Sequence, residues 1–213
     1  MKILAVSDQV VDSLYTANVK DRFGDVDLIL GCGDLPYFYL EFLVSALDRP
    51  LYYVNGNHDK SIELTADGMR RITAAGCDPI GGRVVMAKGL IIAGLDGSIR
   101  YNYESPYQFT QSQMNLRALR LAVHLIPTRM RYGRWLDILV AHSPPFGVGD
   151  GPDPAHIGFR ALNALIRYLK PRYLLHGHQH VYRGRKPGVR VASTMVLNVF
   201  PYRVIEWGHD DAG

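Results

Sequence analysis

Asp, Asn and His residues occur in five short clusters whose side chains could together bind metal ions. The clusters are Asp8, Gly33-Asp34, Gly56-Asn57-His58-Asp59, His142 and Gly177-His178-Gln179-His180. Carboxylate, amide and imidazole groups in one site suit first-row divalent metals such as Mn, Fe and Zn. Taken singly, an Asp after a strand is more often a helix cap, and a His is more often a core or surface residue. A metal site therefore requires that the fold bring the clusters together.

Each cluster lies at the end of an apolar segment that the sequence pattern predicts to be a buried strand. These segments are residues 2–7, 27–31, 51–54, 136–141 and 173–180. Helical segments, expected over 13–22 and from Pro36 onward, join the first three strands, and this alternation predicts a mostly parallel sheet. Ligands of such sheets bind beyond the carboxyl ends of the strands. Ending buried strands in Asp, Asn and His is costly unless something binds these side chains.

The last cluster offers two imidazoles at one strand end. On a strand, His178 and His180 would face the same side, because residues two apart do so. Both rings could therefore reach a single site.

The rest of the chain predicts further elements but no second domain. The expected elements are two strands over 82–95, a polar and aromatic loop over 98–112, a helix over about 112–126 that Pro127 stops, a Gly- and Pro-rich loop over 143–158, and two or three antiparallel strands over 189–206. With no linker, repeat or low-complexity segment, residues 1–213 are expected to form a single domain.

The ordered clusters resemble the motifs of the calcineurin-like metallophosphoesterases, in particular small bacterial-type members. The family pattern is D-x-H, G-D, G-N-H-[DE], a lone His and G-H-x-H, and the resemblance runs from Asp8 to His180. GNHD and GHQH in this order are highly specific, whereas GD alone is weak. The resemblance implies an α/β fold in which two mixed β-sheets form a sandwich flanked by helices, with the metals at one edge.

The resemblance also implies a centre of two divalent metal ions, with Mn²⁺ favoured and Fe or Zn as alternatives. Asp34 would bridge both ions. Asn57, His142 and His178 would complete one site, and Asp8 and His180 would serve the other. A water between the two ions would lose a proton readily and act as the nucleophile.

Further residues are expected to act on the substrate rather than on the metals. By the resemblance, His58 would be a general acid or charge stabiliser at the scissile phosphate, with Asp59 orienting its ring. His156, in the loop over 143–158, is a candidate for contact with the phosphate. The loop from Tyr101 to Phe109 is expected either to stack a ring of the substrate or to pack on itself.

The first motif departs from the family pattern because it reads Asp8-Gln9-Val10, and valine cannot bind a metal. Three interpretations are open. The site with Asp8 and His180 binds its ion weakly, with water in the empty position; or Gln9, Asp12 or His176 substitutes; or the centre holds one metal or none that is catalytic. Some family members that have lost ligands serve as scaffolds for other proteins.

Charge and composition add little about partners. The net charge of +4 fits an anionic substrate but also an ordinary surface, and it is too mild to favour nucleic acid. The basic clusters are Arg129, Arg131 and Arg134, and Arg183, Arg185, Lys186 and Arg190. Without a signal-peptide pattern or a run of about 20 apolar residues, we expect no membrane association and a cytoplasmic location.

These observations predict a metal-dependent hydrolase of phosphate esters that acts on a small phosphorylated substrate. The resemblance slightly favours phosphodiesters over monoesters. The alternative is a catalytically weakened or inactive scaffold of the same fold that binds a protein partner. The state of the metal site beside Val10 separates the two.

Overall fold

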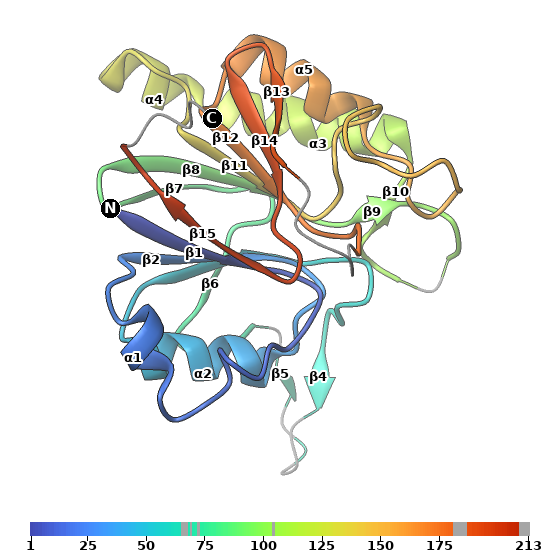
Figure 1. The fold of residues 1–213 in the computed structure, drawn as a ribbon. Helices are drawn as coiled ribbons and strands as arrows, with labels where there is room; N and C mark the ends of the chain where they lie inside the picture. Colours follow the sequence, from blue (N-terminus) through green and yellow to red (C-terminus); the bar gives the residue numbers. More distant parts are fainter. Residues whose placement is uncertain (65–67, 69, 72, 104, 181–186, 209–213) are drawn as a thin grey trace.

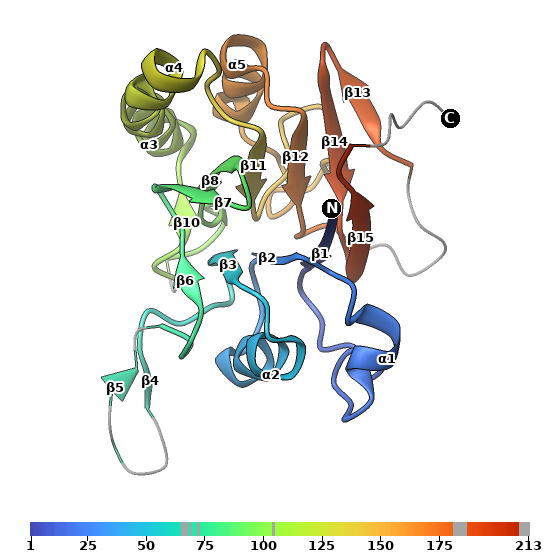
Figure 2. The ribbon, with the colours of Figure 1, turned by 90° about the vertical axis from the view of Figure 1, so that its left-hand side faces the viewer.

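The computed structural model describes residues 1–64, 68, 70, 71, 73–103, 105–180 and 187–208. Two β-sheets face one another, and helices lie on both outer sides (Figure 1). Figure 2 shows the resulting four layers from the side, in the order helix, sheet, sheet and helix. The predicted sandwich of two mixed sheets flanked by helices is confirmed.

The first sheet carries the amino-terminal clusters. Across the sheet, its strands are β15 (Tyr202–Glu206), β1 (Lys2–Val6), β2 (Leu28–Cys32), β3 (Leu51–Val54) and β6 (Asp78–Pro79). β1, β2, β3 and β6 are parallel to one another, and β15 is antiparallel to β1. The carboxyl ends of β1, β2 and β3 therefore meet at one edge of the sheet.

The second sheet carries the remaining clusters. Across the sheet, its strands are β13 (Val189–Val191), β14 (Thr194–Asn198), β12 (Tyr173–His176), β11 (Ile138–Ala141), β8 (Leu90–Leu95) and β7 (Val84–Ala87). The four central strands are parallel, and β13 and β7 are antiparallel to their neighbours. β11 and β12 therefore end side by side.

The helices cover the two outer faces of the sandwich. α1 (Val19–Phe23) and α2 (Tyr37–Leu47) lie on the first sheet, and α3 (Gln111–His124) and α5 (Arg160–Leu169) lie on the second. α4 (Ile126–Tyr132) follows α3. Two short ladders complete the described fold, β4 (Glu63–Leu64) with β5 (Arg70–Arg71) and β9 (Ser98–Ile99) with β10 (Gln108–Phe109).

Both faces of the central strands are buried. In β1, Ile3 and Ala5 pack between the sheets, whereas Leu4 and Val6 pack toward α1 and α2. Burial on both faces explains why these strands read as continuous apolar runs rather than as an alternating pattern. Of the helices in the described part of the chain, none is long and apolar enough to cross a membrane.

Two helix predictions need correction. Of the segment 13–22, only the part from Val19 onward is helical, because Ser13, Thr16 and Asn18 before it favour turns over helix interiors. Pro127 does not simply stop a helix. α3 already ends at His124, and Pro127 lies in the first turn of α4, where a missing backbone N–H costs little.

Two strand predictions also differ from the structure. The strand expected over 173–180 ends at His176, so His178 and His180 lie beyond it. The strands over 189–206 do not form one antiparallel group. β14 is parallel to β12, and β15 belongs to the other sheet, next to β1.

Candidate metal centre

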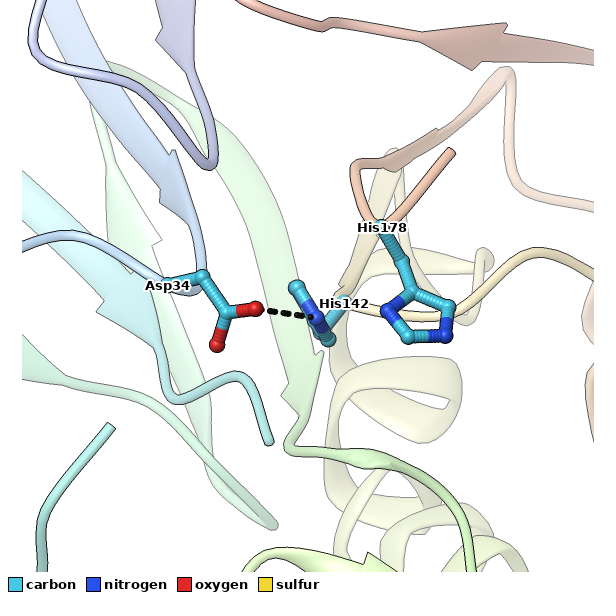
Figure 3. A group of neighbouring side chains, drawn as sticks. All are labelled: Asp34, His142 and His178. Atoms are coloured by element: carbon cyan, nitrogen blue, oxygen red, sulfur yellow. Dashed lines mark ion pairs between the residues drawn. The ribbon is translucent and has the colours of Figure 1, made fainter. Parts of the chain in front are cut away.

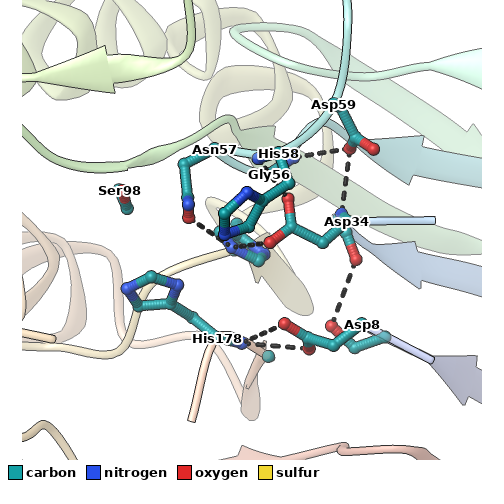
Figure 4. Close-up of polar contacts among 12 residues, drawn as sticks. Asp8, Asp34, Gly56, Asn57, His58, Asp59, Ser98 and His178 are labelled. Carbon is teal, nitrogen blue, oxygen red and sulfur yellow. Dashed lines mark hydrogen bonds and ion pairs between the residues drawn. The ribbon is translucent and has the colours of Figure 1, made fainter. Parts of the chain in front are cut away.

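The carboxyl ends of five parallel strands bring the predicted metal ligands into one region. Asp8, Asp34 and Asn57 follow β1, β2 and β3 of the first sheet, and His142 and His178 follow β11 and β12 of the second. Figure 4 shows Asp8, Asp34, Asn57 and His178 gathered in the space where the two sheets meet. The region therefore depends on both sheets, which explains why its members are so far apart in the sequence.

Three of these residues adopt a backbone conformation that side chains rarely favour. Asp8, Asp34 and His178 have φ angles of 63°, 56° and 64°. The left-handed region costs a residue with a Cβ about 1–2 kcal/mol, although Asp tolerates it better than most. Three such residues at one edge indicate a local geometry that serves a function.

Glycines make room for the carboxylates. A Cβ added at Gly56 would collide with Oδ1 of Asp34, and one added at Gly177 would collide with Oδ2 of Asp8. The glycines of the GNHD and GHQH motifs are therefore needed for the close approach of the acidic side chains.

Asp34, His142 and His178 form the one group of Asp, Glu, Cys or His residues among the described ones that is spaced to hold a metal ion. One potential ligand atom from each lies within 4.8 Å of the others. Figure 3 shows the three side chains. His142 is fully buried, and its Nδ1 lies 2.8 Å from the carbonyl oxygen of Cys32. Because Nδ1–H donates to that carbonyl, Nε2 is left to face Asp34 at 3.2 Å.

Asn57 offers an amide oxygen to the same group. Its Oδ1 lies 3.1 Å from Nε2 of His142, and its Nδ2 donates to the hydroxyl of Tyr101 at 3.1 Å. The Tyr101 contact orients the amide so that the oxygen faces the centre. Two imidazole nitrogens, a carboxylate and an amide oxygen fit a first-row divalent metal.

Asp8 and His180, the residues expected to serve a second cation, contact one another beside this group. The backbone N–H of His178 donates to both carboxylate oxygens of Asp8, at 3.1 and 3.0 Å, and Nε2 of His180 lies 3.2 Å from Oδ1 of Asp8. The ring of His178 instead points toward His142. The reasoning that placed both histidine rings on one face of a strand was therefore wrong, since the His178 ring lies against His142 whereas the His180 ring lies against Asp8.

Comparison with known proteins decides the family. The model of the calcineurin-like phosphoesterase family matches residues 1–182. The chain belongs to this family. No curated protein matches it significantly.

Several solved structures share the fold of this chain, although their sequences are less than 20% identical to it. One is 17% identical and covers 96% of this chain and 94% of its own, with a TM-score of 0.65. The protein TT1561 of Thermus thermophilus is 16% identical and covers 93% of this chain and 88% of its own, with a TM-score of 0.60. Vacuolar protein sorting 29 from Cryptosporidium parvum, with a TM-score of 0.44 at 16% identity, covers 93% and 72%, and this likeness is too weak to bear on function.

Val10, which stands where the family pattern has a histidine, belongs to the apolar core. It is half-buried and packs against the cluster between the first sheet and α1 and α2. The three residues that could replace the missing ligand gain no support. Gln9 and Asp12 are exposed, and His176 is buried with its Nδ1 2.9 Å from the carbonyl of Gly177.

His58 and Asp59 have separate roles in this phosphoesterase-family site. The backbone N–H of exposed His58 donates to Oδ1 of Asp34 at 2.7 Å, which places the residue beside the centre. The expectation that Asp59 orients the His58 ring was wrong. Oδ2 of Asp59 accepts from the backbone N–H groups of Asp34 and Gly56, at 2.9 and 2.7 Å, and so ties two ligand loops together. Burial and then the charge of Asp34 raise the pKa of Asp59 to about 7.

His156 lies at the edge of the centre, as its place in the loop suggested. Its ring centroid is 5.1 Å from that of His178, and its Nδ1 lies 2.8 Å from the Asp153 carboxylate. The same loop presents the carbonyl of Ala155 to Nε2 of His178 at 2.8 Å. Contact between His156 and substrate stays a prediction.

Of the basic residues considered for nucleic acid, Arg183, Arg185 and Lys186 lie outside the described residues.

Sequence reasoning missed Asp96, a buried residue that supports the loop before Asn57. Its Oδ1 accepts from the backbone N–H of Asn55 at 2.8 Å, and its Oδ2 accepts from Arg117 at 3.1 Å. It follows the apolar strand β8. The same strand-end signal that singled out Asp8 and Asp34 could have found it.

The charges of the centre depend on one another. Burial lowers the pKa of His142, but the adjacent carboxylate of Asp34 outweighs burial, and the pKa rises to about 10. Burial alone would raise the pKa of Asp34, yet the positive charge of His142 holds that pKa well below its ordinary value. A proton on Nε2 of His142 thus occupies the position that a cation would take.

This pairing predicts how the stability of the metal-free protein depends on pH. The pKa of His142 is raised in the folded state from 6.5 to about 10, so its contribution to the free energy of unfolding is complete below pH 6.5 and is lost as the pH rises through about 10. Thermal unfolding in a chelator should therefore show a falling Tm across this window. His142→Gln should flatten the fall, and an equal slope in both proteins would contradict the assignment.

Proposed function

We propose that this protein is a metal-dependent hydrolase of phosphate esters, with phosphodiesters slightly favoured over monoesters. The observation that carries the proposal is the convergence of Asp34, Asn57, His142 and His178 at the meeting edge of the two sheets. Each of these residues has a second contact that orients its ligand atom. Such support is typical of metal sites, where a second contact orients each ligand.

The donor set fits two divalent cations, for which we propose Mn²⁺, with Fe or Zn as alternatives. Asn57, His142 and His178 would hold one cation, Asp8 and His180 the other, and Asp34 both. Bound cations would supply positive charge that lowers the pKa of an attacking water and stabilises the phosphoryl oxygens. Because the Asp8 half lacks a replacement for the missing histidine, we propose that it binds its cation more weakly.

The residues of the chain itself would bind and orient the ester. Exposed His58 stands beside Asp34, where its ring can donate a proton to the leaving oxygen. Asp59 fixes the loops of Asp34 and Gly56 and thereby positions His58. His156 lies next to His178, where it could contact the phosphate.

Val10 favours a second candidate function. Since valine at this position packs into the core rather than replacing a ligand, the protein is alternatively a weakened or inactive member of its fold that binds a protein partner. The hydrolase would turn over phosphate esters, whereas the scaffold would do so weakly or not at all.

The proposal is tested by assaying bis-p-nitrophenyl phosphate and p-nitrophenyl phosphate with added Mn²⁺, before and after treatment with EDTA. We expect turnover of both esters with Mn²⁺, higher kcat/KM for the diester, and loss of activity in EDTA that Mn²⁺ restores. Absence of turnover for both esters under Mn²⁺ would support the scaffold instead.

A further inference from the structure

A groove of about 290 Å³ lies between α3 and α5, which lie side by side on the outer face of the second sheet (Figure 2). Alanines from both helices, Ala122 and Ala164 among them, line it, and so do Leu119 and Tyr168, which are 62% and 70% exposed. Asn115 and the hydroxyl of Tyr168 are the polar groups among the side chains that line it. The α3–α5 groove is therefore an apolar hollow on the surface, and none of its lining residues belongs to the metal centre.

α3 has a second apolar face besides the one that packs on the sheet. Met114 and Leu121 belong to the core, whereas Leu116, Leu119 and Val123 are exposed. Spacings of three and four positions place these three side chains on one side of the helix, so the exposed apolar face adjoins the groove through Leu119. Single exposed apolar residues are ordinary, but a contiguous apolar patch on a protein surface marks an interaction site.

The charges around the groove have one sign. α3, α4 and α5 contain no Asp or Glu, yet each of them carries two arginines. Arg120 lies four positions after Leu116, on the exposed apolar side of α3. Arg167 lies three positions after Ala164, which lines the groove from α5. Both arginines are exposed, and neither forms an ion pair with a residue that the structure describes.

The charge of this surface argues against a second copy of the chain as its occupant. A two-fold contact places one surface against itself. It would therefore bring Arg120 and Arg167 of both molecules to the same interface, where like charges repel. The partner should instead carry negative charge on both sides of an apolar surface.

The shape of the groove favours a helix as that partner. The groove-lining part of α3, residues 115–122, covers two helical turns or about 11 Å. A lipid surface is broad and flat, whereas this hollow is narrow and lies between two helices. An amphipathic helix can place apolar side chains at i, i+3, i+4 and i+7 into such a groove. Carboxylates on its two flanks would then face Arg120 and Arg167.

We infer that the α3–α5 groove binds an amphipathic helix of a partner protein that carries acidic side chains on both flanks of its apolar face. Leu119 and Tyr168 contact the apolar face of that helix. Arg120 and Arg167 pair with its acidic side chains. The inference is independent of the metal centre and applies to this chain whether or not it hydrolyses phosphate esters.

The test compares three synthetic peptides of about 18 residues, long enough to form a helix, by fluorescence polarisation with the full chain. The first peptide has leucines at helical spacing and glutamates on both flanks. The second has lysines in place of the glutamates, and the third has the composition of the first in scrambled order. We expect the first peptide to bind at least about 10-fold more tightly than either of the others.

Variants of the groove locate the binding site. Leu119→Ser should weaken binding of the glutamate peptide at least about 10-fold, and its exposed position should leave the fold intact. Phe38→Ser removes an exposed apolar side chain from α2 instead and should bind as the wild type does.

A second pair of variants tests the charges. Arg120→Gln combined with Arg167→Gln should weaken binding several-fold and should reduce the preference for glutamate over lysine. Lys20→Gln combined with Arg22→Gln makes the same loss of charge at exposed positions of α1 and should have no effect.

Equal affinities for the three peptides would overturn the inference, and so would unchanged binding in both groove variants. Two further measurements identify another occupant. Binding to phosphatidylglycerol vesicles that Leu119→Ser abolishes, without preference for the glutamate peptide, would replace the helix by a membrane surface. Self-association in sedimentation equilibrium that Leu119→Ser abolishes, again without that preference, would replace it by a second copy of the chain.

Discussion

The Asp34→Asn variant is expected to lose at least about 10³-fold in kcat/KM for bis-p-nitrophenyl phosphate, or about 4 kcal/mol of transition-state stabilisation. Asp34 accepts from the backbone of His58, faces Nε2 of His142 and is the residue proposed to hold both cations. Asparagine preserves the shape and tolerates the left-handed backbone at φ 56°. The change therefore removes the negative charge with little effect on the loop.

Asp48→Asn is the matched control for this variant. Asp48 also has a left-handed backbone, with φ 54°, and it lies at the end of α2 with an exposed side chain. Kinetics under saturating Mn²⁺ and bound metal per chain should be measured for both variants. We expect near wild-type values for Asp48→Asn and loss of bound metal in Asp34→Asn. Retention of activity in Asp34→Asn would contradict a centre built on this carboxylate.

The His58→Ala variant is expected to reduce kcat by about 10²–10⁴-fold while leaving bound metal unchanged. The backbone N–H of His58 contacts Asp34 and survives the substitution, so the metal centre should stay intact. What is lost is the ring that would protonate the leaving oxygen. The effect should shrink for esters with a good leaving group, such as p-nitrophenol, and grow for alkyl esters.

His124→Ala controls for loss of an imidazole elsewhere. His124 is exposed in the last turn of α3 and should show wild-type kinetics with either class of ester. If His58→Ala reduced kcat equally for good and poor leaving groups, a role as general acid would be wrong. A loss of bound metal in His58→Ala would instead indicate that the residue supports the centre structurally.

The convergence of the ligands was predictable because it follows from the order of strands. Apolar segments that end in Asp, Asn or His, joined by helices, place those residues at one edge of a parallel sheet, and Asp8, Asp34 and Asn57 lie there. The family motifs then supplied the pairing of this edge with His142 and His178 on the second sheet.

The local backbone at the centre was not predictable, since it depends on contacts between distant segments. The turn at His178, with φ 64°, is held by a bond from its N–H to Asp8, which is 170 positions away. This turn ends the strand at His176 and separates the rings of His178 and His180. The alternation of side chains along a strand predicts their directions only while the strand continues, and it does not predict where the strand ends.

The same reason explains why the polar contacts of Asp59 and Tyr101 were not predictable. Asp59 accepts from Asp34, 25 positions away, rather than from its neighbour His58, and Tyr101 supports Asn57 across 44 positions. Asp59 was expected to pair with His58 because the two residues are adjacent in the sequence. In both cases the partner lies in a loop that is distant in the sequence.

The most direct test of a metal-dependent hydrolase is to measure bound metal and turnover in the same samples as Mn²⁺ is added back to metal-free protein. We predict that hydrolysis of bis-p-nitrophenyl phosphate rises with the amount of bound Mn²⁺ and reaches its maximum at about two ions per chain. His180→Ala should weaken binding of the later ion more than the first. Full binding of Mn²⁺ without turnover of either nitrophenyl ester would contradict the account and identify the protein as a metal-binding scaffold.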